Sequence, residues 1–311
     1  MKQLGLVGQG DKLERLMRSV QAGRIVHALL FTGPAGTGKR TAANWFARAM
    51  LCTGEDRPCG VCPACKRYLA GSHPDVRVLR PEKNVIKVDE IRDLIEYLSL
   101  RPYEGGWHVV IIEQADKMNA SAQNALLKTL ENPTGDAMFF LISESPGGLL
   151  STILSRCQTL RFHELSADDC AEVLIDRGVS AERARLLAGL AQGAVGRALA
   201  LNEDEGFFAL REKTLQSLES LNGNASVAAA AAMISEEKGS ETTILDVMEL
   251  WARDLMAVQE GGAPFEAPDE ARLRQSKLNG AKLLRAVMRA RQQLFSNVAW
   301  NQALETMYFE L

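Results

Sequence analysis

The stretch GPAGTGKRT, residues 33–41, differs at one position from a phosphate-binding loop. Gly33, Gly38 and Lys39 follow the spacing G-x-x-x-x-G-K, in which backbone N–H groups at a helix N-terminus surround phosphate oxygens. The next residue is Arg40, where Ser or Thr would hold a magnesium ion. The stretch therefore predicts a strand, a loop and a helix around a nucleotide-type site that lacks a metal ligand.

Short apolar runs alternate with helical patterns on both sides of this loop. The runs that indicate strands are HALLFTG (27–33), DVRVL (75–79), HVVII (108–112) and AMFFLIS (137–143). Segments with helical spacing cover 39–51, begin again near Asp89, and cover 119–131 before Pro133. This alternation predicts an α/β fold with a parallel sheet covered by helices on both faces, and a ligand site at the carboxyl ends of the strands.

From about Ser166 the strand signal disappears and the pattern becomes helical. Two apolar stripes with helical spacing are present, one at Ile244, Met248, Trp251, Leu255 and Val258 and one at Leu284, Val287, Met288 and Leu294. Both stripes predict bundle core, and packing of part of them on neighbouring subunits stays open. We therefore expect an α/β core over 1–165, a small helical region over 166–205 and an all-α domain over 206–311.

Four of the six cysteines lie in one short segment, CTGEDRPCGVCPAC, at Cys52, Cys59, Cys62 and Cys65. Two overlapping C-x-x-C steps suit four thiolates around a tetrahedral zinc, which is a closed structural site with no position for water. Reduced surface thiols or a redox C-x-x-C pair are the alternatives. We expect one zinc ion in a module near 52–65, and packing roles for the two remaining cysteines.

Hydrolysis of a nucleotide also needs acidic residues after a buried strand. The strand at 108–112 is followed by Glu113 and Gln114, where an active ATPase of this class would show Asp-Glu. Gln114 has no carboxylate to activate water, and Arg40 places a cation where a metal ligand is needed. We therefore expect no efficient ATP hydrolysis, while binding of ATP or ADP stays open because the loop glycines and Lys39 are intact.

Composition limits the class of protein further. A hydrophobic fraction of 46% and a charged fraction of 24% are ordinary for a soluble globular protein. With a formal net charge of -3, any contact with nucleic acid has to come from a local basic patch. Neither a leader-like segment nor an apolar run of membrane-spanning length is present, so we expect a cytoplasmic protein without membrane contact.

Several segments together resemble one family. Besides HALLFTGPAGTGKRT and the four cysteines followed by GSHPD, they are QADKMNASAQNALLKTLENP (114–133), ILSRCQ (153–158), GAVGRAL (193–199) and NVAWNQALE (297–305). Over nearly its whole length the chain resembles the delta-prime subunits of the bacterial DNA polymerase III clamp loader, which are AAA+ proteins. The resemblance implies an AAA+ core with a zinc-binding insert, a helical lid over 166–205 and a helical collar over 206–311 that joins subunits into a ring.

The resemblance also implies roles for individual residues. Arg156, in the triplet SRC, matches the arginine finger that reaches into the ATP site of an adjacent motor subunit, and pairing with a carboxylate on its own surface is the alternative. Arg197, in GAVGRAL, matches a lid arginine that senses nucleotide, or else is a solvated helix residue. The implied degenerate nucleotide site consists of Gly33, Gly36, Gly38, Lys39, Arg40, Thr41 and Arg197.

The function that the resemblance implies is that of a non-hydrolysing clamp-loader subunit in a DNA polymerase complex. Such a subunit assembles with gamma or tau motor subunits and with delta, supplies an arginine finger in trans, and helps to load the sliding clamp on primed DNA. An active AAA+ ATPase motor subunit is one alternative. A zinc-dependent DNA-binding protein is another, although only Arg57, Lys66 and Arg67 provide positive charge near the cysteines.

Overall fold

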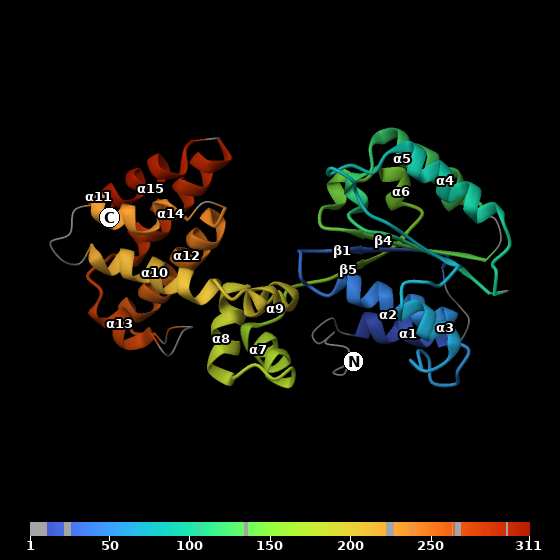
Figure 1. The fold of residues 1–311 in the computed structure, drawn as a ribbon, viewed down its shortest axis with the longest axis horizontal. Helices are drawn as coiled ribbons and strands as arrows, with labels where there is room; N and C mark the ends of the chain where they lie inside the picture. Colours follow the sequence, from blue (N-terminus) through green and yellow to red (C-terminus); the bar gives the residue numbers. More distant parts are fainter. Residues whose placement is uncertain are drawn as a thin grey trace. The chain divides into compact units, whose positions relative to one another are not determined.

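The computed structural model describes residues 11–21, 26–104, 106–133, 136–221, 227–237, 239–262, 264, 269–296 and 298–311. The chain divides into two compact units, residues 1–165 and residues 166–311. The first is an α/β unit and the second is helical (Figure 1). Among the described residues, no helix combines the length and the apolar composition that a membrane span requires.

The first unit contains a five-stranded sheet with the strand order β2-β3-β4-β1-β5 and parallel pairing throughout. Its strands are β1 (Ala28–Thr32), β2 (Val76–Leu79), β3 (His108–Ile112), β4 (Ala137–Ser143) and β5 (Gln158–Arg161). Strands β1, β3 and β4 are buried at every position because helices cover both faces of the sheet (Figure 1). The parallel sheet with flanking helices confirms the α/β core that the sequence predicts.

The helices of this unit form two layers (Figure 1). One layer holds α1 (Asp11–Gln21), α2 (Lys39–Leu51) and α3 (Pro63–Leu69), and the other holds α4 (Val88–Ser99), α5 (Ala120–Glu131) and α6 (Ser151–Leu154). Phe31 and Phe140 point to the first layer, where their ring centroids lie 5.9 Å apart, next to Phe46 of α2. Leu30 and Leu141 belong to the apolar cluster under the second layer. Packing in these two clusters holds the strands in position, and the candidate site lies at the ends of the strands.

In the second unit, all secondary-structure elements of the described residues are helices. Helices α7 (Ala167–Asp176), α8 (Ala181–Leu190) and α9 (Val195–Glu203) pack on one another, and we call them the three-helix group. The six-helix group consists of α10 (Phe207–Ser220), α11 (Val227–Ser235), α12 (Glu241–Gln259), α13 (Glu270–Gln275), α14 (Gly280–Phe295) and α15 (Trp300–Phe309). Within this unit α8 contacts α12.

One of the two predicted apolar stripes is displaced. On α12 the predicted stripe is confirmed for Ile244, Met248, Trp251 and Leu255, which are buried. On α14 the prediction is confirmed for Val287 and wrong for Met288, which is 61% exposed. The buried face of α14 consists of Leu283, Ala286, Val287 and Ala290. Small residues line this face and let α12 and α14 approach closely. At Gly280 a Cβ would lie 2.7 Å from the carbonyl oxygen of Ala252.

Candidate functional site

The loop between β1 and α2 has the backbone shape of a phosphate-binding loop. Gly33, Gly36 and Gly38 have φ angles of 137°, 75° and 89°, in a region that favours glycine. Gly33 also has no space for a side chain, because a Cβ would lie 2.2 Å from the carbonyl oxygen of Phe162. Left-handed residues in such a turn orient successive N–H groups toward one concave surface, which is where anions bind.

Lys39, the first residue of α2, folds back onto this loop. Its Nζ donates to the carbonyl oxygens of Gly33 at 2.6 Å and Pro34 at 2.5 Å, and the residue is 6% exposed. Burial lowers the pKa of Lys39, and the nearby carboxylates of Glu144 and Asp116 oppose this shift. A phosphate in the loop would have to compete with the two carbonyl oxygens for the ammonium group.

Arg40 and Glu113, two departures from the ATPase pattern, bond to each other. The Nε of Arg40 donates to Oε1 of Glu113 at 2.8 Å, and its Nη2 lies 2.8 Å from Oε2. The Nε of Arg80 lies 3.2 Å from Oε1 of the same carboxylate, whose side chain is 15% exposed. Both carboxylate oxygens of Glu113 therefore pair with guanidinium groups. A magnesium ion would have to compete with these groups for the same oxygens.

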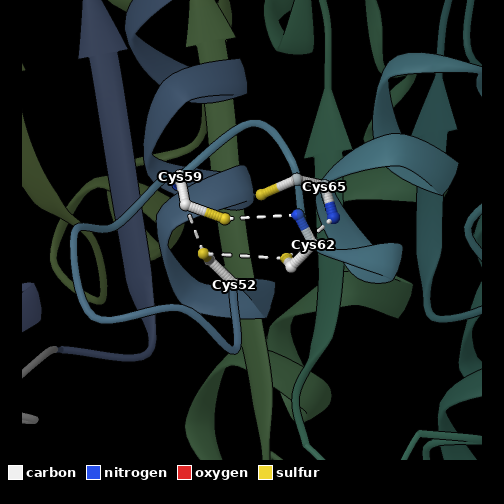
Figure 2. A group of neighbouring side chains, drawn as sticks. All are labelled: Cys52, Cys59, Cys62 and Cys65. Atoms are coloured by element: carbon white, nitrogen blue, oxygen red, sulfur yellow. Dashed lines mark hydrogen bonds between the residues drawn. The ribbon is translucent and has the colours of Figure 1, made fainter.

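The four cysteines converge at the junction between α2 and α3 (Figure 2). Cys52 follows the last residue of α2, and Cys62 is the N-cap of α3. The four sulfur atoms lie within 4.8 Å of one another, and those of Cys52 and Cys62 are 3.8 Å apart. Four thiolates at a Zn–S distance of about 2.3 Å are separated by about 3.8 Å in a tetrahedron. The donor set therefore fits a tetrahedral zinc ion.

Backbone N–H groups point at three of these sulfur atoms (Figure 2). The N–H of Cys59 donates to Cys52 at 3.3 Å, that of Cys62 to Cys59 at 3.3 Å, and that of Cys65 to Cys62 at 3.4 Å. The Cys65 N–H lowers the pKa of Cys62 to about 5, whereas burial raises the pKa of Cys65 to about 12. A bound cation would offset the cost of burying a thiolate charge, so the arrangement suits a metal better than free thiols.

Arg156 follows α6 and lies at the surface of the first unit. Its Nη1 donates to the carbonyl oxygen of Thr152 at 2.9 Å and to Oγ of Ser155 at 3.3 Å. Its Nη2 forms an ion pair with Glu131, the last residue of α5. The side chain is 32% exposed, and its hydrogen bonds to described residues come from Nη1 and Nη2. Arg156 thus pairs with a carboxylate of its own unit while part of its guanidinium stays accessible.

Arg197 of α9 forms an ion pair with Asp246 of α12, in the second unit. The other carboxylate oxygen of Asp246 accepts from Arg291 of α14 at 2.5 Å. Arg291 also lies 3.0 Å from Glu249, and Glu249 accepts from Arg253 at 2.6 Å. Arg197 is therefore part of a network of ion pairs, while the phosphate-type loop belongs to the first unit.

Known proteins match the chain over most of its length. Residues 8–166 match the sequence profile of a family described as DNA polymerase III, delta subunit. The delta-prime subunit of DNA polymerase III from Bacillus subtilis is 35% identical over 299 residues, which cover 92% of this chain and 91% of that protein. The chain belongs to the delta-prime subunits of DNA polymerase III.

Two further relatives share parts of this delta-prime chain. The delta-prime subunit from Pseudomonas aeruginosa is 48% identical over 138 residues, which cover 42% of this chain and 41% of that protein. The tau subunit of DNA polymerase III from Bacillus subtilis is 34% identical over 208 residues, or 63% of this chain and 36% of that protein. These findings confirm the predicted resemblance to delta-prime subunits.

The structure brings the predicted residues of this delta-prime chain together in part. Gly33, Gly36, Gly38, Lys39, Arg40 and Thr41 lie in one loop and the start of α2, and the four cysteines form one cluster. The sequence analysis does not identify Glu131 or Asp246 as ion-pair partners. A signal exists for Glu131, because a carboxylate at the last residue of a helix lies close to exposed carbonyl oxygens and favours a nearby cation. Asp246 lies inside α12 and has no such signal.

Proposed function

We propose that this chain is a non-hydrolysing subunit of the DNA polymerase III clamp loader. It assembles with motor ATPase subunits of the gamma or tau type and with delta, and it acts with the sliding clamp on primed DNA. Family membership supports the clamp-loader role, and the bidentate pair between Arg40 and Glu113 supports the absence of hydrolysis. In this proposal the first unit is an AAA+ core, the three-helix group is its lid and the six-helix group is the collar.

The Arg40 guanidinium supports the non-hydrolysing assignment on electrostatic grounds. Phosphoryl transfer to water requires magnesium beside the outer phosphates and a group that orients the water. Arg40 already neutralises the Glu113 carboxylate, and Gln114 offers no negative charge. Binding of ATP or ADP by the loop without turnover stays a prediction, as does a nucleotide-sensing role for Arg197.

Arg156 is proposed as the arginine finger for a neighbouring motor subunit. A guanidinium is always charged and presents a planar fork of donors that matches phosphate oxygens. Placed at the surface and 32% exposed, it has donors left for a phosphate held by another subunit. Zinc, held by the four cysteines, is proposed as a structural ion that fixes the segment between α2 and α3.

The isolated chain is expected to hydrolyse ATP at a negligible rate, and Arg40→Thr is expected not to restore hydrolysis. The substitution frees one side of Glu113, but Arg80 stays beside it and Gln114 still lacks a carboxylate. The ATPase rates of the unmodified chain and of Arg40→Thr are measured as the release of phosphate from magnesium ATP. Added to motor subunits with clamp and primed DNA, the unmodified chain is expected to increase their turnover.

Lys39→Ala is the control for this experiment. If the isolated chain turned over ATP at the rate of an ordinary AAA+ motor and Lys39→Ala abolished that turnover, the chain would be an active ATPase subunit. Failure to co-assemble with motor subunits or to stimulate them would contradict the clamp-loader assignment. A salt-dependent DNA titration of the isolated chain tests the remaining alternative, a DNA-binding zinc module.

A further inference from the structure

Glu131 occupies a place where its charge does not favour the helix that carries it. It is the last residue of α5, next to the carbonyl oxygens that carry the negative end of the helix dipole. Its ion-pair partner is Arg156, which lies 25 positions later in the sequence. Its side chain is 44% exposed, so burial does not force this pairing.

The guanidinium of Arg156 is held at three points. Thr152 and Ser155 accept hydrogen bonds from Nη1, and Glu131 accepts from Nη2. A guanidinium has five N–H groups, so the N–H on Nε and one N–H on Nη2 are left for a further acceptor. Bonds to its own unit therefore fix the orientation of the fork and still leave it two donors.

We infer that Glu131 is a positioning residue for the arginine finger, which it orders before the finger meets the phosphate of a neighbouring subunit. This inference rests on the proposed role of Arg156. A free arginine side chain samples many rotamers, and ordering it only in the transition state would raise the barrier. Thr152 and Ser155 hold one end of the fork from its own turn, and Glu131 fixes the other end from a different helix.

The test compares Glu131→Gln and Glu131→Ala in the complete loader, assembled with its motor subunits, clamp and primed DNA. We expect the kcat for ATP hydrolysis at the affected site to fall on the order of tenfold, which is less than the roughly 10²-fold cost of a 1 Å misplacement because Thr152 and Ser155 still hold Arg156. The KM for ATP should change by less than about twofold, because a residue that acts through Arg156 affects the transition state rather than the binding of the nucleotide. The melting temperature of the isolated variants should stay equal or rise, because an unfavourable charge is removed from a helix end.

A double variant distinguishes positioning from a structural role. If Glu131 acts through Arg156, then Glu131→Ala combined with Arg156→Ala should be no slower than Arg156→Ala alone. Asp89→Asn, which breaks an exposed ion pair with Arg92 in the same unit, serves as the matched control and should leave the rate unchanged.

The outcomes separate this inference from the proposed function. If Arg156→Ala lowers the rate and the Glu131 variants keep the normal rate, or gain rate, the positioning role is overturned and the finger stands. The same holds if the Glu131 variants lower the melting temperature and lose assembly. If Arg156→Ala has no effect, the finger assignment fails, and the role of Glu131 fails with it.

Discussion

Arg156→Ala is expected to lower clamp- and DNA-stimulated ATP hydrolysis by the assembled loader, and to slow clamp loading, while folding, zinc content and assembly stay intact. A guanidinium supplied in trans contributes roughly 10³ to 10⁵ in rate at one site of well-studied nucleotide hydrolases. The loader as a whole should lose less, because only the site that faces this subunit is affected. Phosphate release and the rate of clamp loading by the reconstituted complex measure the effect.

Arg156→Lys is the matched control for this prediction. An ammonium group keeps the charge but lacks the planar fork, so it cannot bond Thr152 and Glu131 and still present two donors to a phosphate. The lysine variant should therefore recover little of the lost rate. A normal loading rate for the assembled alanine variant would leave Arg156 as a surface residue that pairs with Glu131.

Cys62→Ser is expected to release zinc and to unfold the segment between α2 and α3. A structural zinc ion contributes on the order of 10 kcal/mol of folding free energy at neutral pH. Apolar burial contributes little to this segment, since only Cys52 is buried among residues 52–62 and Val61 is 72% exposed. Elemental analysis should find one zinc ion per unmodified chain, and proteolysis of the variant should begin between α2 and α3.

Cys170→Ser is the control for the loss of a thiol. Cys170 is buried away from the cluster, and burial alone raises its pKa to about 11, so this variant should keep its zinc and lose only packing stability. Freshly purified reduced protein without zinc would contradict the assignment and leave metal-free thiols or a redox C-x-x-C pair as the alternatives.

The parts of the fold that the sequence predicts best are those with a continuous local signal. Strands β3 and β4 match the predicted segments at both ends, because strands buried on both faces are apolar at every position. Helix α3 was not predicted, since it has only seven residues and begins inside the cysteine segment, where ligand spacing hides the helical period. The buried face of α14 was misplaced in part, because Ala286 and Ala290 contribute to it beside Leu283 and Val287, and alanines carry a weak apolar signal.

Residues of the site that are close in sequence could be predicted, whereas contacts between residues far apart in sequence could not. The loop glycines, Lys39 and the cysteines are close in sequence, so their spacing alone predicts their chemistry. Arg40 and Glu113 are 73 positions apart, and Arg197 and Asp246 are 49 positions apart. These pairs form only because the sheet and the helices bring their elements together, and no local pattern encodes them.

The ion pairs around Arg197 give the second unit a stiffness that depends on salt. Positive and negative side chains alternate from Arg197 through Asp246, Arg291 and Glu249 to Arg253, across α9, α12 and α14. Sliding α9 along α12 would separate Arg197 from Asp246, so this ion pair resists shear between the two helix groups. These side chains are 18% to 50% exposed, and ions in solution therefore reach them. At 1 M salt, where the screening length is about 3 Å, this resistance should largely disappear.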